Sequence, residues 1–391
     1  MKASAEYKIT TVNTLEEIES IRPIWESIQT HPWADIDHYL NNLNYIPNTT
    51  TPHIILLTQN EKPKSLVIGR IDKRIFDLKL GHKKIPSPTV RSFTVSYGGL
   101  LGKMTDYECK LVYKEFMRLL KDGKADVIRL NYLSVNSHLY NLALTMPGFL
   151  SQDRFPVFNT HWQMDLPDRM EAFYKSRSSK HRYWLRRLDR IIERDFPNQV
   201  KYIIYGGNSN LSKVFTDAEI IAYQTYQRGL HVGFIDNEQT RKNYSFLAKK
   251  ERFRAYMMYI KDKPCAFWLG EHYKNTFYLY STGYIPGFKK YEIGTVLFVK
   301  MLEDLCSSGD IKYLDFGFGD APYKSRFGDK SWEEASIYIF SRKFNGLKLN
   351  FMRLLTSGTY SILIKLLIRF HVLEKVKKLR RRKMIENAKK E

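Results

Sequence analysis

The fold is decided by residues 253–316, which read FRAYMMYIKDKPCAFWLGEHYKNTFYLYSTGYIPGFKKYEIGTVLFVKMLEDLCSSGDIKYLDF. After a three-strand meander, this stretch predicts a helix over about Ile293–Ser307 and a strand at Tyr313–Phe316. The order meander, turn, helix, strand is typical of a mixed α/β domain. The meander itself is predicted from three runs rich in aromatic and apolar residues that are separated by polar turns: Phe253–Tyr259, Ala266–Glu271 and Thr276–Ser281.

The first half of the chain predicts a similar order of elements, although the two halves share no visible residue identity. Thr14 and Glu17 form a capping-box pattern at the start of a helix expected over Leu15–Gln29. The other elements expected there are strands at Tyr7–Val12, His53–Thr58, Ser65–Asp72, Ser92–Leu101 and Asp126–Leu130, and helices at Ala34–Leu43 and Tyr107–Leu120.

The chain length supports two domains, because 391 residues with 43% hydrophobic content are enough for two ordinary globular cores. We therefore expect an N-terminal domain over residues 1–159 and a C-terminal domain over 160–344. The composition changes to Leu, Ile, Lys and Arg beyond Phe344. This change predicts a basic amphipathic helical tail over residues 345–391.

The formal net charge of +22 favours anionic partners without choosing between nucleotide phosphate, nucleic acid and acidic lipid. Cys109, Cys265 and Cys306 lie far apart, which indicates neither a disulfide framework nor a metal site. The N-terminus lacks an apolar run of signal-peptide length, and Tyr360–Val372 is too short to span a membrane. We therefore expect a cytoplasmic protein without a metal.

The first stretch with chemical content is Ser178–Arg190. On a helix, Arg182, Arg186 and Arg190 form one stripe, so the segment combines an apolar side with a basic ridge. Such a ridge suits either anion binding or a solvated charged face, and the sequence leaves both interpretations open.

The second stretch is Tyr313–Phe327. It places the carboxylate of Asp315, the phenol of Tyr323 and the ammonium of Lys324 around one glycine-rich loop after a strand. Active sites of α/β folds often lie at such strand ends, although Asp315 would equally suit a turn cap.

The third stretch is the turn before the long helix, where Lys289 and Lys290 precede Gly294 and Thr295. A helix N-terminus with nearby lysines is a weak phosphate-binding signal.

Together these features carry a family resemblance. Ser-x-Lys-x-Arg-x-x-x-Arg-Arg at 178–187, Gly283-Tyr284, the Gly294 helix start and Asp315-Phe316-Gly317 followed by Tyr323-Lys324 resemble the CelD-like branch of the GNAT acetyltransferases. This branch is associated with cellulose and exopolysaccharide synthesis and is related to the Fem peptidyltransferases. The resemblance is clearest over residues 160–330 and weaker before them.

The resemblance implies two tandem GNAT-like domains with one acyl-donor site in the C-terminal half. It also implies acetyl-CoA or another acyl-CoA as donor and an amino group of a sugar or related small metabolite as acceptor. The sequence departs from the general GNAT pattern because it lacks the Arg/Gln-x-x-Gly-x-Gly pyrophosphate loop, for which only Gly294 remains.

Acyl transfer to an amine needs a group for the amine proton, donors for the oxyanion and an acid for the thiolate. We expect Asp315 to act as base or amine-orienting group and Tyr323 as acid, with Tyr280 and Tyr284 as further candidates. The residues expected to bind the donor are Lys180, Arg182, Arg186, Lys290, Gly294, Thr295 and Lys324.

Two alternatives remain open at this stage. The positive charge also suits a Fem-like transferase that uses aminoacyl-tRNA on a peptidoglycan precursor. The missing pyrophosphate loop would also permit a degenerate GNAT module that only binds a ligand.

The tail carries a separate prediction. Leu363, Leu366, Leu367, Phe370 and Leu373 recur at helical spacing, and the basic cluster Arg380–Lys383 follows. This pattern fits a helix packed on the second domain or a helix at an anionic membrane surface.

Overall fold

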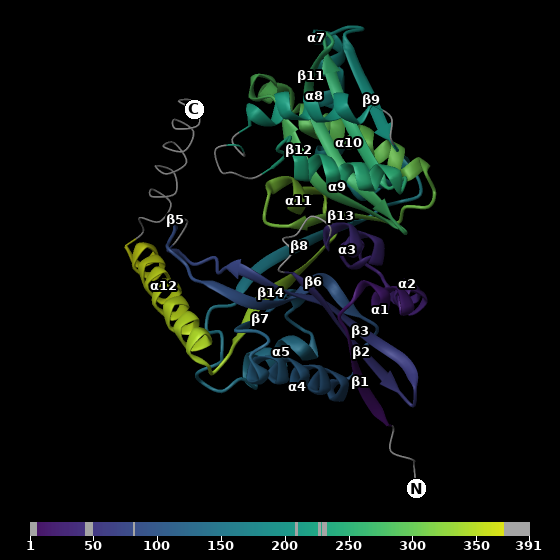
Figure 1. Ribbon diagram of the computed structural model, residues 1–391. Helices are drawn as coiled ribbons and strands as arrows, with labels where there is room; N and C mark the ends of the chain where they lie inside the picture. Colours follow the sequence, from purple (N-terminus) through teal and green to yellow (C-terminus); the bar gives the residue numbers. More distant parts are fainter. Residues whose placement is uncertain are drawn as a thin grey trace. The chain divides into compact units, whose positions relative to one another are not determined.

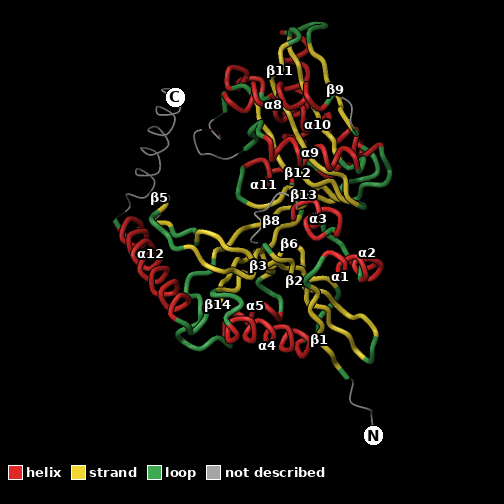
Figure 2. The backbone as a smooth tube through the Cα atoms, in the orientation of Figure 1, coloured by secondary structure: helices red, strands yellow, loops and turns green. Residues whose placement is uncertain are grey.

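The computed structural model describes residues 6–43, 50–80, 83–207, 210–225, 228 and 233–370. The chain divides into two compact units (Figures 1 and 2). The first unit comprises residues 1–160 and 332–373, and the described part of the second lies within residues 161–331.

The sheet of the first unit has the strand order β1-β2-β3-β6-β7-β14. The strands are antiparallel to their neighbours except for β6 and β7, which run parallel. The bounds are Tyr7–Val12 (β1), Thr51–Gln59 (β2), Lys62–Ile75 (β3), Thr89–Leu101 (β6), Val127–Ser134 (β7) and Lys330–Phe340 (β14), with a small hairpin of Lys79–Leu80 (β4) and Lys83–Lys84 (β5).

Helices cover both faces of this sheet. One face packs against Phe116 of α4 and Leu139 of α5, and the other packs against Ile18 of α1, Trp25 of α2 and Tyr39 of α3. The helices are Leu15–Ser20 (α1), Arg22–Ile28 (α2), Pro32–Ala34 (the 3₁₀ turn η1), Ile36–Leu43 (α3), Asp106–Asp122 (α4), His138–Thr145 (α5) and Phe344–Arg369 (α12).

The sheet of the second unit has the order β9-β10-β11-β12-β13-β8. Here β12 and β13 form the parallel pair, and the other neighbours are antiparallel. The bounds are Val157–Asp165 (β8), Val200–Gly206 (β9), Phe253–Ile260 (β10), Lys263–Tyr273 (β11), Thr276–Tyr284 (β12) and Tyr313–Phe318 (β13).

This sheet is also covered on both faces. Apolar residues of α6, α7, α10 and α11 pack on one face, and those of α8 and α9 pack on the other. The helices are Met170–Ser176 (α6), Ser179–Asp195 (α7), Leu211–Tyr223 (α8), Glu238–Lys249 (α9), Pro286–Tyr291 (the 3₁₀ turn η3), Ile293–Ser307 (α10) and Pro322–Phe327 (α11).

The two units share one topology. In each, an antiparallel meander leads into a helix, α4 or α10, and then into a strand parallel to the last meander strand. The predicted mixed α/β fold of two similar halves is therefore confirmed.

Two of the differences between the predicted and the observed bounds have an identifiable cause. The expected helix Leu15–Gln29 is two helices, because Pro23 has no N–H to continue the ladder and Ile21 caps both segments. The predicted second domain runs to residue 344, but β14 pairs with β7, so Trp332 and the residues after it lie in the first unit.

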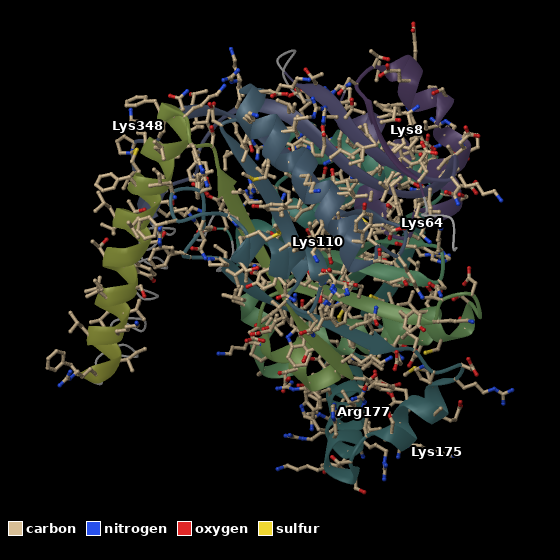
Figure 3. The ribbon with its side chains drawn as sticks, turned by 90° about the horizontal axis from the view of Figure 1, so that it is seen from below. Lys8, Lys64, Lys110, Lys175, Arg177 and Lys348 are labelled. Atoms are coloured by element: carbon tan, nitrogen blue, oxygen red, sulfur yellow. The ribbon has the colours of Figure 1, made fainter. Side chains whose placement is uncertain are left out.

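Helix α12 also differs from the expected tail. It begins at Phe344, and Lys348 lies near this start (Figure 3). Its buried residues pack on the first unit instead of the second. Over its full length α12 is long and apolar enough to cross a membrane, by length and composition only, whereas the expectation concerned the shorter run Tyr360–Val372. The basic cluster at 380–383 lies outside the described residues.

Candidate active site

The central feature of the second unit is the short contact between β12 and β13. The two strands pair only from Thr276 to Tyr278 on β12 and from Tyr313 to Asp315 on β13. Tyr280 forms a bulge, because Leu269 of β11 pairs with Ser281 while Gly270 pairs with Leu279. Within the described residues, the pairing of β12 with β13 therefore ends at Tyr278, before the bulge.

The N-terminus of α10 follows the bulged end of β12 in the chain. Glu292 stands at the cap with φ of 47°, no side chain accepts a cap hydrogen bond, and the first turn holds no acidic residue. Such an end carries partial positive charge and suits a phosphate. Tyr284 lies beside it, because a Cβ on Gly294 would meet the Tyr284 ring at 3.4 Å.

The other predicted residues of this turn have local partners. The Thr295 N–H donates to the carbonyl of Glu292 at 2.7 Å, and the Trp268 indole donates to the Gly294 carbonyl at 3.1 Å. The Lys290 ammonium lies 4.6 Å from the ring of Tyr291. These contacts hold the first turn of α10 in place, while the N-terminus of the helix has no side-chain cap.

Helix α7 lies next to this helix start, because the Trp184 indole donates to the Glu292 carboxylate at 3.2 Å. Lys180 is exposed one turn before Trp184 and therefore shares its side of the helix. Arg326, which the sequence analysis did not single out, lies 4.7 Å from the Trp184 ring and 3.8 Å from Glu292. Arg326 thus lies beside this helix start, and the exposed Lys180 is on the same side of α7 as Trp184.

The two predicted arginines of α7 have other neighbours. Arg182 donates to the carbonyl of Arg177 at 2.7 Å and to the Ser179 hydroxyl at 3.0 Å, so it closes the end of α6. Arg186 lies 5.6 Å from the Tyr174 ring. Their expected contact with a donor stays a prediction.

Asp315 is buried at the point where β12 and β13 separate. Both of its carboxylate oxygens lie 2.9 Å from His161 Nε2, and its Oδ1 accepts the Gly317 N–H at 2.7 Å. Tyr278 is its register partner on β12, and the nearby carboxylate contributes to raising the pKa of that phenol after burial, the larger cause. Asp315 thus belongs to a buried polar group in the second unit.

Lys324 is part of the same surroundings. Only 6% of it is exposed, and its ammonium donates to the carbonyl of Phe318. Burial lowers the pKa of Lys324 to about 8, although Asp315 and Asp320 act in the opposite direction. A buried amine with this pKa suits proton exchange better than the solvent-facing anion contact that the sequence suggested.

The three candidate tyrosines, Tyr280, Tyr284 and Tyr323, have different environments. Tyr280 donates to the buried carboxylate of Glu271, and burial, followed by that charge, raises the pKa of Tyr280 well above its ordinary value. Tyr323 packs against the rings of Trp268 and Phe316, at 5.3 and 6.0 Å. Tyr284 is 39% exposed at the end of β12, which makes it the most accessible of the three.

The cysteines do not supply a nucleophile. All three are buried and free, and burial raises the pKa of Cys265 to about 12 and those of Cys109 and Cys306 to about 11. Because the thiolate is the reactive form, these side chains fit structural roles.

The matching family agrees with this location. Residues 219–325 match the family described as "Acetyltransferase (GNAT) domain". The matched segment contains the bulge of β12, the start of α10, Asp315 and Lys324. No curated protein matches the chain in sequence.

Solved structures are similar in fold. FemX has 10% sequence identity and a TM-score of 0.54, covering 85% of this chain and 98% of its own. A tandem GNAT protein from the clavulanic acid biosynthesis pathway has 9% identity and a TM-score of 0.48, covering 86% and 99%. The C-terminal domain of a putative lysylphosphatidylglycerol synthetase from Agrobacterium fabrum has 11% identity and a TM-score of 0.43, covering 71% and 86%.

The second unit thus contains a GNAT acetyltransferase domain, and the prediction of a GNAT-type N-acyltransferase is confirmed at this level. His161 and Arg326 escaped the sequence analysis. The pairing of β8 with β13, which brings His161 to Asp315, joins segments far apart in the sequence and left no local signal.

Proposed function

We propose that this protein transfers an acyl group, in the simplest case acetyl, from acyl-CoA to an amino group of a sugar or related small metabolite. The observation that carries the proposal is the start of α10, which has no side-chain cap and follows the bulged end of β12, inside the segment that matches the acetyltransferase family. The helix end suits the pyrophosphate.

The chemistry assigns a role to each group. The acceptor nitrogen attacks the thioester carbonyl, the new C–N bond forms, and the C–S bond breaks. Asp315, held by His161, orients the amine or receives its proton, and Lys324, on whose pKa Asp315 acts, is the candidate to exchange that proton. Tyr323 or the more exposed Tyr284 would protonate the departing thiolate.

The donor clamp is proposed to consist of Lys180, Arg326 and the N–H groups of α10, with Arg182 and Arg186 holding α7 in place. Glu292 is a negative charge at this position, and its pairing with Trp184 and Arg326 reduces its repulsion toward an anion.

The direct test is mass detection of acyl transfer from acetyl-CoA to a panel of amino sugars, together with calorimetry of acyl-CoA binding. Transfer to an amino sugar supports the proposal. Activity that needs aminoacyl-tRNA and disappears after RNase treatment would favour the Fem-like alternative. Absence of acyl-CoA binding would favour a module without catalysis. The expected association with surface polysaccharide synthesis rests on the resemblance to the CelD-like branch.

We also propose that the outer part of α12 associates with an anionic membrane surface. Among the described residues, none after Arg353 is buried, and the exposed apolar residues include Ile362, Leu363 and Leu366. Leu354–Arg369 would extend about 24 Å, less than the roughly 30 Å of a hydrocarbon core. With Lys365 and Arg369 within it and a basic sequence beyond, this segment suits the interface.

Sedimentation with vesicles containing phosphatidylglycerol tests this association. The triple substitution Ile362→Ser, Leu363→Ser, Leu366→Ser should leave folding intact, since these side chains are exposed, and should abolish sedimentation. Leu15→Ser, at an apolar residue that is 56% exposed on α1, is the control. Equal sedimentation of the triple variant and the wild type would contradict the proposal. The cytoplasmic location stays a prediction.

A further inference from the structure

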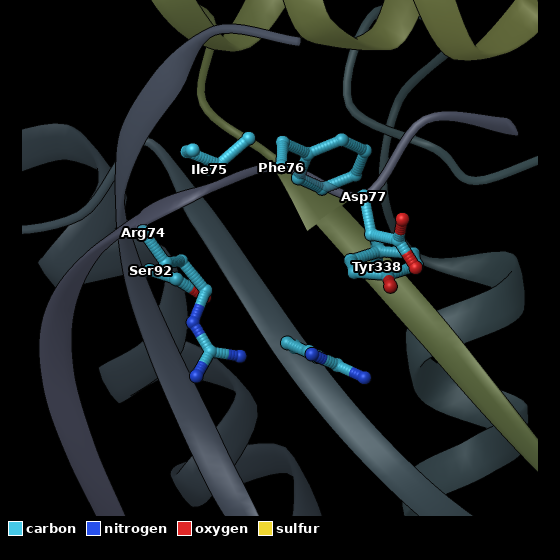
Figure 4. Close-up of a pocket in the computed structure, with 7 residues that line it drawn as sticks. Arg74, Ile75, Phe76, Asp77, Ser92 and Tyr338 are labelled. Atoms are coloured by element: carbon cyan, nitrogen blue, oxygen red, sulfur yellow. The ribbon is translucent and has the colours of Figure 1, made fainter. Parts of the chain in front are cut away.

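A second polar site lies in the first unit, where a cavity of about 300 Å³ opens on the sheet (Figure 4). Its size is at the lower end for small-molecule pockets, which suits a ligand such as a phosphorylated monosaccharide. The cavity is lined by Arg74, Ile75, Phe76, Asp77, Ser92, Arg129 and Tyr338.

Strand register explains why these side chains meet. Arg129 of β7 pairs with Tyr338 of β14 on one side and with Thr94 of β6 on the other. Arg74 lies on β3 two residues after Asp72, the partner of Ser92, and residues two apart on a strand share a face. The two guanidinium groups therefore come from the same face of the sheet.

The positive charge in this cavity exceeds what the local carboxylates balance. Asp72 Oδ2 lies 3.0 Å from Arg74 Nη2 and 3.3 Å from Arg70 Nε, so one carboxylate serves two arginines. Asp77, the other carboxylate, lies 2.7 Å from Lys79 Nζ. Arg129 has no carboxylate within ion-pair distance among the described residues.

Each of these two arginines has an N–H group whose hydrogen-bonding capacity is not satisfied. Within the described part of the chain, the Nε–H groups of Arg74 and Arg129 are buried without a hydrogen-bond partner. Burial, with Arg70 and Arg129 nearby, lowers the pKa of Arg74 despite the opposing effect of Asp72. Two cationic groups with unsatisfied donors in one cavity are costly unless an anion compensates them.

The remaining walls add a flat apolar surface. The rings of Phe76 and Tyr338 lie 5.1 Å apart, and Arg129 and Arg353 lie 6.0 and 4.6 Å from the Tyr338 ring. Arg353 is itself held by Asp153 at 2.9 Å, so it fixes Tyr338 from α12. A ligand with an anionic end and a less polar body would match both kinds of wall.

We propose that this cavity binds the phosphate group of a sugar phosphate or of a lipid headgroup through Arg74 and Arg129. Planar guanidinium groups bind phosphate oxygens in a forked geometry, which uses the donors that are unsatisfied in the free protein. The site lies within the first unit and does not depend on the acyl transfer proposed for the second.

The test compares Arg129→Met with Lys73→Ala in the full chain. Lys73 is exposed between Asp72 and Arg74 on β3, so its substitution removes the same charge from the opposite face of the strand. Calorimetric titration with inorganic phosphate and with glucosamine 6-phosphate should show affinity reduced about tenfold or more in Arg129→Met, as expected for a lost charge-assisted hydrogen bond. Lys73→Ala should match the wild type.

Folding is checked by the melting temperature, which should not fall in Arg129→Met because the removed charge has no ion-pair partner. Vesicles containing phosphatidylglycerol distinguish the two ligand sources. Weaker vesicle binding of Arg129→Met than of Lys73→Ala identifies a headgroup, and equal vesicle binding with weaker glucosamine 6-phosphate binding identifies a soluble sugar phosphate. Equal affinity of the two variants for both phosphates, or stronger loss in Lys73→Ala, would overturn the proposal.

Discussion

The two units share a topology, but the starts of their central helices, α4 and α10, are capped differently. In the first unit, Thr105 and Glu108 form a reciprocal capping box, so the chain's own side chains occupy the N-terminus of α4. In the second unit, α10 has no side-chain cap and no acidic residue in its first turn. The same helix position is closed in one unit and open in the other.

The two units also differ at the strand that precedes the central helix, which is β6 in the first unit and β12 in the second. In the first unit, the turn η1 packs on β6, with the His31 ring 4.3 Å from that of Tyr97. A Cβ on Gly98 would lie 2.5 Å from His31, so only glycine fits beneath this ring. The paired segments also differ in charge, since β13 carries Asp315 and β7 carries Arg129. The strand after the central helix thus carries a carboxylate in one unit and a cation in the other.

The largest expected effect is that of Asp315→Asn, which should lower kcat by about a hundredfold or more if the carboxylate orients or deprotonates the amine. The control is Asp126→Asn in the first unit, where a similarly buried carboxylate accepts the Arg91 N–H at 2.9 Å. That variant should lose melting temperature with kcat per folded molecule unchanged. If Asp315→Asn behaved like this control, Asp315 would only support its loop.

The second prediction concerns Lys324, whose folded-state pKa of about 8 lies below the ordinary 10.5. Between these two pH values the unfolded chain binds more protons, so this group makes the wild type more stable as pH rises through the window. Below pH 8, burial of the charged Lys324 ammonium lowers the free energy of unfolding by its full amount. Lys324→Met should therefore raise the free energy of unfolding at pH 7 by about 2 to 3 kcal/mol.

Chemical denaturation at pH 7 and pH 10 measures this difference. The gain in Lys324→Met should shrink at pH 10, whereas Lys330→Met, which removes an exposed lysine paired with Asp165, should show no such pH dependence. A gain equal at both pH values would mean that burial does not shift the titration of Lys324.

These residues also show how far the sequence could lead. The meander and the helix over Ile293–Ser307 were predictable because apolar periodicity is a local property, and the predicted helix has the bounds of α10. Asp315 and Lys324 could be singled out because they share one loop. Their burial and the contact of Asp315 with His161 depend on long-range strand pairing, which composition does not encode.

Long-range packing also accounts for contacts that the sequence could not show. Arg182 recurs on a basic helical stripe, yet it binds the backbone at the end of α6, because that end lies within reach and needs donors. One of the two interpretations of the last helix placed it on the second domain, but Asp153 of the first unit pairs with Arg353 and fixes α12 there. Neither partner could be identified without the fold.

The third prediction introduces into α10 a carboxylate at the position that Glu108 occupies in α4. Thr295 occupies the third position of α10, as Glu108 does in α4, so Thr295→Glu would place a carboxylate where the donor phosphate is proposed. The KM for acyl-CoA should rise about tenfold or more, in line with roughly 1.5 kcal/mol for one unfavourable charge. Thr295→Gln, which has the same shape without the charge, should have the smaller effect.

The smallest effect is expected from the reverse change, Glu108→Gln in the first unit. Glu108 accepts the Thr105 N–H at 2.6 Å, and the weaker neutral acceptor should cost about 1 kcal/mol of unfolding free energy, or a few degrees of melting temperature. Acyl-CoA should still bind with one equivalent per chain by calorimetry, because the turn at His31 and Gly98 continues to fill the opening beside β6. A second equivalent in this variant would show that the capping box alone closes the first unit to the donor. An unchanged single equivalent together with lowered stability would place the decisive difference between the units in the packing of η1 on β6.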